Sequence, residues 1–138
     1  MELNEAKDKF IQSWGSLGSQ WGINRTMAQI HALLLIAPEP MSTDEVMEQL
    51  KISRGNANIN LRELMNWQLV RKEVKTGERM EFFVAEKDMW KVFRLIFKER
   101  KKRGIDPMIE VIHELKSVKG DQKNKDFAAF SEVMDDLE

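Results

Sequence analysis

Asparagine and arginine side chains are concentrated between residues 53 and 66, at spacings that would place several of them on one face of a helix. Amide and guanidinium groups form paired hydrogen bonds with the edges of adenine and guanine. The outer face of such a helix would carry Gly55, Asn58, Ile59, Arg62 and Asn66. We therefore predict a helix that reads nucleic-acid bases from its outer side.

A core must hold this helix from its other side. Ser53 can accept a hydrogen bond from a free backbone N–H, so we expect it to cap the helix start. The side that we expect to face the core carries Ala57, Leu61, Leu64 and Gln68 at helical spacing.

A β-hairpin is predicted directly after this helix. Residues 69–75 alternate between apolar and polar, Thr76-Gly77-Glu78 provide a turn, and residues 79–84 return as a second strand. The hairpin presents Lys72, Lys75 and Arg79, which could bind phosphates or enter a minor groove. We interpret the hairpin as a wing beside the reading helix.

The distribution of charge agrees with this interpretation. The net charge of the 138-residue chain is −1, but residues 51–79 hold seven basic and three acidic residues, which leaves −5 for the remainder. A basic patch on a nearly neutral chain is expected of a module that docks on phosphates. A merely solvated surface is the alternative.

Two helices are predicted before the reading helix. Asn24 can cap a mostly apolar helix that runs to about Ala37, and Ser42 with Glu45 forms a capping box for a short helix. Helix, short turn and helix in this order form a helix-turn-helix.

Amphipathic helices are expected on both sides of this module. An N-terminal helix from about Leu3 to Gly18 has a seam of bulky side chains that suits either subunit contact or packing on its own domain. After residue 88 we expect a helix with a basic end and a break near Gly104, a helix capped by Asp106, and a last helix. The apolar side chains expected to line the last two helices are Ile109, Val111, Ile112, Leu115, Phe127, Phe130, Val133, Met134 and Leu137.

The order of these elements, with the runs Ser53-Arg54-Gly55-Asn56, Leu61-Arg62-Glu63-Leu64 and Trp67-Gln68-Leu69-Val70-Arg71, resembles the MarR-type transcriptional regulators and especially their GbsR-like branch. The resemblance covers nearly the whole chain and is most specific over residues 21–88. It implies a mainly α fold with a small β-hairpin wing, a winged helix-turn-helix, in a homodimer that binds double-stranded DNA. We expect a single domain over 1–138, with a DNA-binding core at about 22–88 and helical dimerisation regions at 1–21 and 89–138.

The DNA contacts that we predict are Ser53, Arg54, Asn56, Asn58, Ile59, Arg62, Lys72, Lys75 and Arg79, with Asn60 as a further polar reader near the core edge. One position departs from the family pattern, which has glycine where this chain has Gln68. A left-handed Gln would cost roughly 1 kcal/mol. We therefore expect a differently built helix end.

Four tryptophans are many for this length, and they suit either helix packing or an effector pocket. Trp14, Trp21, Trp67 and Trp90 are the candidate effector contacts, and the resemblance suggests a quaternary ammonium compound held by aromatic faces.

Several classes of site are not expected. The chain has no cysteine, its two histidines are far apart in sequence, and we find no phosphate loop, nucleophile motif, signal peptide or membrane-spanning run. We expect a cytoplasmic DNA-binding regulator with no cofactor and no metal, rather than an enzyme. A winged-helix module that contacts only other proteins is the alternative.

Overall fold

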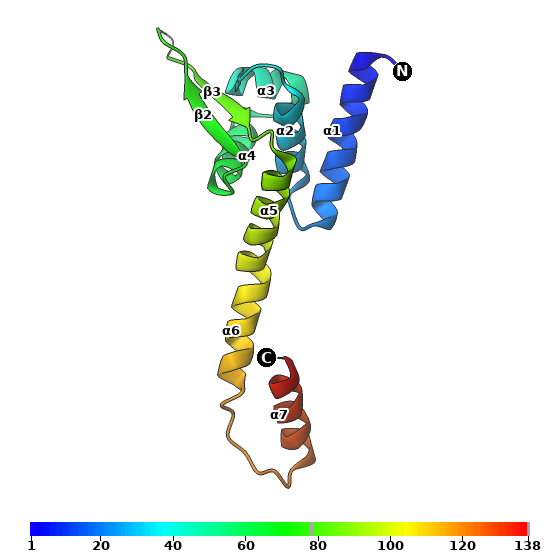
Figure 1. Ribbon diagram of the computed structural model, residues 1–138, viewed down its shortest axis with the longest axis vertical. Coiled ribbons are helices and arrows are strands. Elements are labelled where there is room, and N and C mark those ends of the chain that lie inside the picture. The colour runs from blue at the N-terminus through cyan, green and yellow to red at the C-terminus, as the bar shows by residue number, and fades with distance from the viewer. Residues whose placement is uncertain (78, 138) are drawn as a thin grey trace. The chain divides into compact units, whose positions relative to one another are not determined.

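A computed structural model describes residues 1–77 and 79–137, which fold mainly into helices with one small antiparallel sheet (Figure 1). The elements are α1 (Leu3–Gln20), α2 (Arg25–Ile36), β1 (Met41–Ser42), α3 (Thr43–Leu50), α4 (Arg54–Asn66), β2 (Val70–Val74), β3 (Glu81–Ala85), α5 (Met89–Arg100), the π-helix η1 (Lys101–Ile105), α6 (Asp106–Leu115) and α7 (Lys125–Leu137). The predicted fold class is confirmed: helix, turn and helix are followed by a hairpin wing. Glu78 of the expected wing turn and Glu138 lie outside the described residues.

The chain forms two compact units, Met1–Ile96 and Phe97–Glu138. The helix α1 belongs to the same compact unit as the helix-turn-helix and the wing. The expected single domain, with dimerisation regions at 1–21 and 89–138, stays a prediction. The first unit contains every residue that we predicted to contact DNA.

Three helix starts follow the predicted caps, at Asn24, Ser42 and Ser53. The Asn24 side chain accepts hydrogen bonds from the backbone N–H groups of Thr26 and Met27. Ser42 and Glu45 form the expected capping box, with both reciprocal bonds present. Because local hydrogen bonds decide these starts, the sequence alone was sufficient to predict them.

The sheet contains a strand that we did not predict. Its order is β1-β3-β2, and the two-residue β1 pairs Met41 with Phe83 and Ser42 with Phe82. The longer β2–β3 pair aligns Val70 with Ala85 and Val74 with Glu81. The strand β1 thus fixes the base of the wing to the start of α3.

The helices α1 and α2 lie side by side in the first unit (Figure 1). The helix α1 reaches Gln20, two residues beyond the predicted end, and it buries Ile11, Gly15 and Gly18. A Cβ added to Gly18 would lie 2.6 Å from the Cβ of Ala28. Gly18, where we expected the helix to end, therefore permits a close approach of the two backbones.

The second unit differs from the prediction in two respects. A π-helical turn, η1, connects α5 directly to α6, so there is no break at Gly104. The final helix α7 buries none of its residues, and Ile112 is the buried residue of α6. Phe130, Val133 and Leu137, which we expected to line a buried face, are 39%, 50% and 55% exposed, so that expectation is wrong.

Candidate nucleic-acid interface

The helix α4 has one buried side and one exposed side. Ala57, Leu61 and Leu64 are at most 1% exposed and belong to the main core. Asn58 and Arg62 are exposed, and Ile59 is 65% exposed. The side chains able to hydrogen-bond with base edges are therefore turned away from the core.

The start of α4 is organised around Ser53. Its hydroxyl oxygen accepts a hydrogen bond of 3.1 Å from the backbone N–H of Asn56, as a helix cap does. Ser53, Arg54 and Asn56 are all exposed. The predicted contacts on this first turn are thus on the same open surface.

Two residues were assigned to the wrong side of this helix. Asn60, which we expected to read bases, is 2% exposed and donates hydrogen bonds to Asn56. Gln68, which we expected to face the core, is exposed and lies beyond the end of α4 at Asn66. Both errors arise near the edges of the helix, where spacing alone determines the side least well.

The end of α4 has the geometry that glycine would adopt. Gln68 has a φ of 65°, its N–H donates to the carbonyl of Met65, and the N–H of Leu69 donates to that of Leu64. These two bonds form a Schellman motif, in which one residue has a left-handed conformation and the side chains at the positions of Leu64 and Leu69 commonly make an apolar contact. The expectation of a differently built helix end is therefore wrong: Gln68 adopts the left-handed conformation, while Leu64 and Leu69 are each 1% exposed.

The wing carries the predicted basic residues in different surroundings. Lys72 forms an ion pair of 3.1 Å with Glu81 across the strands. The Lys75 ammonium lies 4.1 Å from the centre of the Phe82 ring, an arrangement that favours a cation. Lys75 and Arg79 are exposed near the tip of the hairpin.

A shallow hollow of about 290 Å³ connects the start of α3, the helix α4 and the wing. Arg54 and Asn58 line it from α4, and Glu81 lines it from β3. Asp44 also lines it and forms an ion pair with Arg54. The pairing of Arg54 and Lys72 with carboxylates was missed, because Asp44 and Glu81 reach them only through tertiary structure.

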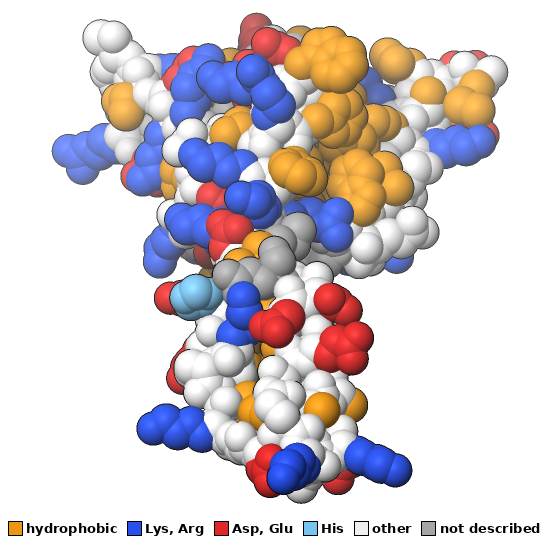
Figure 2. All heavy atoms as spheres, turned by 60° about the horizontal axis from the view of Figure 1, so that its bottom comes forward, with side chains coloured by type: hydrophobic (Ala, Val, Ile, Leu, Met, Phe, Trp, Pro, Cys, Tyr) orange, Lys and Arg blue, Asp and Glu red, His pale blue; other side chains and the backbone are white. Residues whose placement is uncertain are grey.

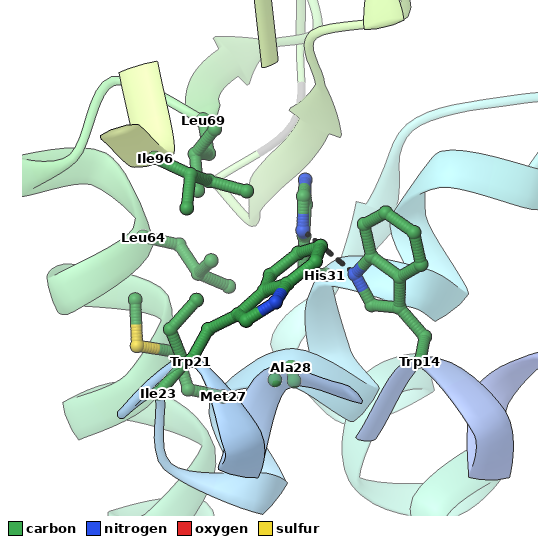
Figure 3. Close-up of a pocket in the computed structure, with 10 residues that line it drawn as sticks. Trp14, Trp21, Ile23, Met27, Ala28, His31, Leu64, Leu69 and Ile96 are labelled. Carbon is green, nitrogen blue, oxygen red and sulfur yellow. Dashed lines mark hydrogen bonds between the residues drawn. The ribbon is translucent and has the colours of Figure 1, made fainter. Parts of the chain in front are cut away.

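The four tryptophans do not form one site. The rings of Trp14 and Trp21 pack edge to face, with their centres 6.2 Å apart. Together with His31 they line a small cavity (Figure 3). Trp67 is buried outside the cavity lining, and Trp90 is 80% exposed. Of the four, the structure brings together only Trp14 and Trp21, and their role as effector contacts stays a prediction.

His31 is the titratable residue in the lining of this cavity. Its Nδ1 accepts a hydrogen bond of 3.2 Å from the indole N–H of Trp14. Burial, and then the positive charge of Lys87, lowers its pKa to about 4, so the ring is neutral at pH 7 with its proton on Nε2. No described residue accepts a hydrogen bond from that N–H. The cavity volume of about 10 Å³ is close to what one water molecule needs.

Lys87 closes the end of α2. Its ammonium donates hydrogen bonds of 2.6, 2.8 and 3.1 Å to the carbonyl oxygens of Leu34, Leu35 and Ala37. A cation at a helix C-terminus is favoured by the helix dipole. Partial burial lowers the pKa of Lys87 from its usual value. This contact attaches the segment after the wing to the core of the first unit.

Other kinds of site are not seen in the described part of the chain. Residues 1–77 and 79–137 contain no cluster of three or more histidine or acidic side chains arranged to hold a metal ion. Within the same residues, no helix is both long and apolar enough to cross a membrane.

The chain is similar to known regulators in sequence and in fold. It is 28% identical over 112 residues to the HTH-type transcriptional repressor GbsR of Bacillus subtilis. The aligned region covers 81% of this chain and 62% of GbsR. The chain thus spans less than two thirds of the length of GbsR. No protein-family model matches the sequence.

Solved structures support the fold. A crystal structure of a transcriptional regulator superposes with a TM-score of 0.66 at 15% identity, covering 96% of this chain and 90% of that one. The Staphylococcus aureus regulator MepR superposes with a TM-score of 0.50 at 12% identity, covering 98% and 95%. The resemblance to the MarR-type winged helix-turn-helix regulators is confirmed.

Proposed function

We propose that this chain binds double-stranded DNA and regulates transcription, with α4 in the major groove and the β2–β3 hairpin as the wing. The observation that carries the proposal is the exposed side of α4, where Asn58, Ile59 and Arg62 stand opposite a fully buried side. Arginine pairs with guanine, asparagine with adenine, and an apolar side chain meets the thymine methyl group. The similarity to GbsR, a transcriptional repressor, supports the same role.

The predicted contacts divide into two groups under this proposal. Ser53, Arg54, Asn56, Asn58, Ile59 and Arg62 lie on α4 or at its cap, where they could approach bases or the phosphates beside them. Lys72, Lys75 and Arg79 lie on the wing, where a positive charge contributes affinity without reading sequence. Arg54 would have to exchange Asp44 for a phosphate.

An electrophoretic shift with the DNA that precedes the chain's own coding sequence tests the proposal. We expect retarded complexes that weaken steeply as salt rises, because phosphate contacts release counterions. Arg79→Ala should reduce both the affinity and the salt slope, and Lys98→Ala on α5 is a matched control for the loss of one charge. Salt-independent binding, or none to any duplex, would contradict DNA recognition.

A module that contacts only proteins is the second candidate. The observation in its favour is apolar exposure around the same surface, where Ile59, Val74 and Met80 are 65%, 77% and 49% exposed. Apolar anchors of this kind are typical of protein interfaces. This candidate would be favoured if the wild-type chain shifts no DNA duplex but binds a protein partner, and if the Ile59→Asp variant no longer binds that partner.

We also propose that the chain is a homodimer. Apolar side chains lie open on the surface (Figure 2). Trp90, Phe93 and Phe97 of α5 are 80%, 43% and 67% exposed, and further exposed apolar residues follow in α6 and α7. Leu3 at the N-terminal seam is 68% exposed, and Phe10, Trp14 and Trp21 are half-buried. Large exposed apolar patches mark interaction sites.

Analytical ultracentrifugation tests the dimer. We expect the wild-type chain to sediment as a dimer at micromolar concentration and Phe97→Glu to move the equilibrium toward monomer. Met80→Glu on the wing is the matched control, because it places the same charge on another exposed apolar residue. A wild-type monomer at all concentrations would contradict the proposal. A dimer would favour pseudo-palindromic DNA with half-sites about 10 bp apart.

The effector remains a prediction that we carry forward for Trp14 and Trp21 alone. A quaternary ammonium group is larger than one water molecule, so the cavity would have to open to admit it. The buried His31 donor and the nearby Lys87 charge oppose a cation there. A tryptophan-fluorescence titration with choline and glycine betaine tests the prediction, with Trp14→Phe as the comparison. Saturable quenching in the wild type alone would support it, and no change in either would contradict it.

A further inference from the structure

Asn60 is a buried amide on the core side of a helix whose other side we propose to read DNA. It is 2% exposed, among the apolar side chains of Ala57, Leu61 and Leu64. A buried polar side chain is costly unless its hydrogen bonds are made. Asn60 makes two with the same residue: its Nδ2 lies 2.9 Å from the backbone oxygen of Asn56 and 2.8 Å from the side-chain Oδ1 of Asn56.

The second of these bonds is the informative one. A bond to the backbone oxygen four residues earlier is a common way for a polar side chain to be satisfied in a helix. The bond to Oδ1 instead fixes the side chain of Asn56, which is exposed on the first turn of α4. The Asn56 backbone N–H is also engaged, by Ser53 Oγ at 3.1 Å. Asn56 is thus held through its backbone and through its amide oxygen.

This arrangement determines which half of the Asn56 amide faces outward. Because Oδ1 is turned toward the buried Asn60, the NH₂ group is turned away from it. An outward NH₂ group donates to acceptors. Guanine offers two acceptors in the major groove, N7 and O6, whereas the usual pairing of asparagine with adenine needs the amide oxygen as well.

We propose that Asn60 is a positioning residue for base selection, which holds Asn56 so that it presents its NH₂ group and favours guanine over adenine. The inference rests on the proposed DNA binding. It assigns a role in specificity to a side chain that cannot touch DNA itself.

Selection from a random duplex library, followed by sequencing of the retained DNA, tests the inference with the full-length chain. We expect the wild type to select guanine at one position in each half-site. Asn60→Leu fills a similar volume but donates no hydrogen bond, so the Asn56 amide can turn over. The preference for guanine at that one position should fall by roughly fivefold or more, while the other positions keep theirs.

A double-mutant comparison separates positioning from a general disturbance of α4. If Asn60 acts through Asn56, then Asn56→Ala and the double variant Asn56→Ala/Asn60→Leu should select the same sequences. A folded Asn60→Leu variant with the wild-type guanine preference would overturn the inference. A further change in the double variant beyond that of Asn56→Ala would also overturn it.

If Asn60→Leu does not fold, the variant Asn56→Asp provides a second test. Residue 56 is exposed, so we expect this variant to fold. The carboxylate still accepts from Asn60 but presents an oxygen outward, so the selected base should change from guanine to cytosine, whose N4 donates. Retention of guanine by this variant would overturn the inference. A wild-type chain that retains no duplex would refute the proposed function itself. The selection with the wild-type chain alone reveals that outcome, before any variant is compared.

Discussion

The two compact units of this chain bury their apolar side chains to very different extents. Of the buried apolar residues in the described part of the chain, all except Ile112 lie in the first unit, residues 1–96. The second unit, residues 97–138, leaves Met108, Ile109 and Val133 about half exposed, at 56%, 46% and 50%. The first unit thus has a core of its own, whereas the second leaves most of its large apolar side chains exposed.

The largest expected effect is a core truncation in the first unit. Leu34 is 1% exposed, so Leu34→Ala should lower the free energy of unfolding by about 2–5 kcal/mol. Leu115 of the second unit is 39% exposed, and Leu115→Ala should cost much less in dilute protein. Denaturant titrations over a range of protein concentrations measure both. An equal loss for the two variants at low concentration would break the comparison between the units.

The next effect is a loss of stability in acid that originates in the first unit. His31 has a folded-state pKa of about 4, below its usual 6.5, so the unfolded chain binds the extra proton first as pH falls. Its contribution is fully present above pH 6.5 and is lost as pH falls toward 4, by about 3 kcal/mol.

The matched control for this prediction is His31→Gln. The glutamine oxygen can still accept from the Trp14 N–H, but the side chain does not titrate. Unfolding free energies from pH 7 to pH 4 should fall less steeply for the variant than for the wild type. Parallel pH curves would show that another group causes the acid sensitivity.

A third prediction concerns charge rather than packing. Arg62 is exposed on α4, so Arg62→Ala should weaken specific DNA binding by about 1–3 kcal/mol with little effect on the unfolding free energy. Lys102→Ala removes one exposed positive charge from the second unit and is the control. Titrations at one fixed salt concentration compare them. Equal losses would mean that Arg62 contributes only general electrostatic attraction.

The smallest effect is expected at the end of α4. Gln68 has a φ of 65°, so Gln68→Gly should remove backbone strain and raise the free energy of unfolding by about 1 kcal/mol. Gln68→Ala keeps a Cβ in the same conformation and should bring no such gain. Thermal denaturation of the two variants distinguishes them, and equal melting temperatures would indicate that the helix end carries no strain.

Local chemistry explains which parts of the fold could be predicted from sequence. Asn24, Ser42 and Ser53 cap their helices through bonds that span two or three residues, and each was identified from its neighbours alone. The exposed residues of α4 were likewise predicted from helical spacing. The side on which Asn60 lies was not, and Gln68 lies beyond the end of the helix.

The features that escaped prediction depend on contacts between distant segments. The strand β1 is only two residues long and exists through its pairing with β3. Asp44 reaches Arg54 ten residues away, across two helices. The exposed faces of α6 and α7 follow an apolar pattern that predicts burial, but a pattern does not specify whether the covering surface belongs to the same chain.

The contact of Gly18 with Ala28 has a consequence for how sequences of this kind can diverge. A methyl group at residue 18 would lie 2.6 Å from the Ala28 methyl carbon, so residue 18 cannot gain a side chain while Ala28 keeps its own. Drift at the two positions should therefore be coupled. A chain with alanine at position 18 should carry glycine at 28, and Gly18→Ala combined with Ala28→Gly should be tolerated better than Gly18→Ala alone. The close crossing of α1 and α2 therefore requires glycine at one of positions 18 and 28 and allows alanine at the other, and we expect natural sequences to have either arrangement.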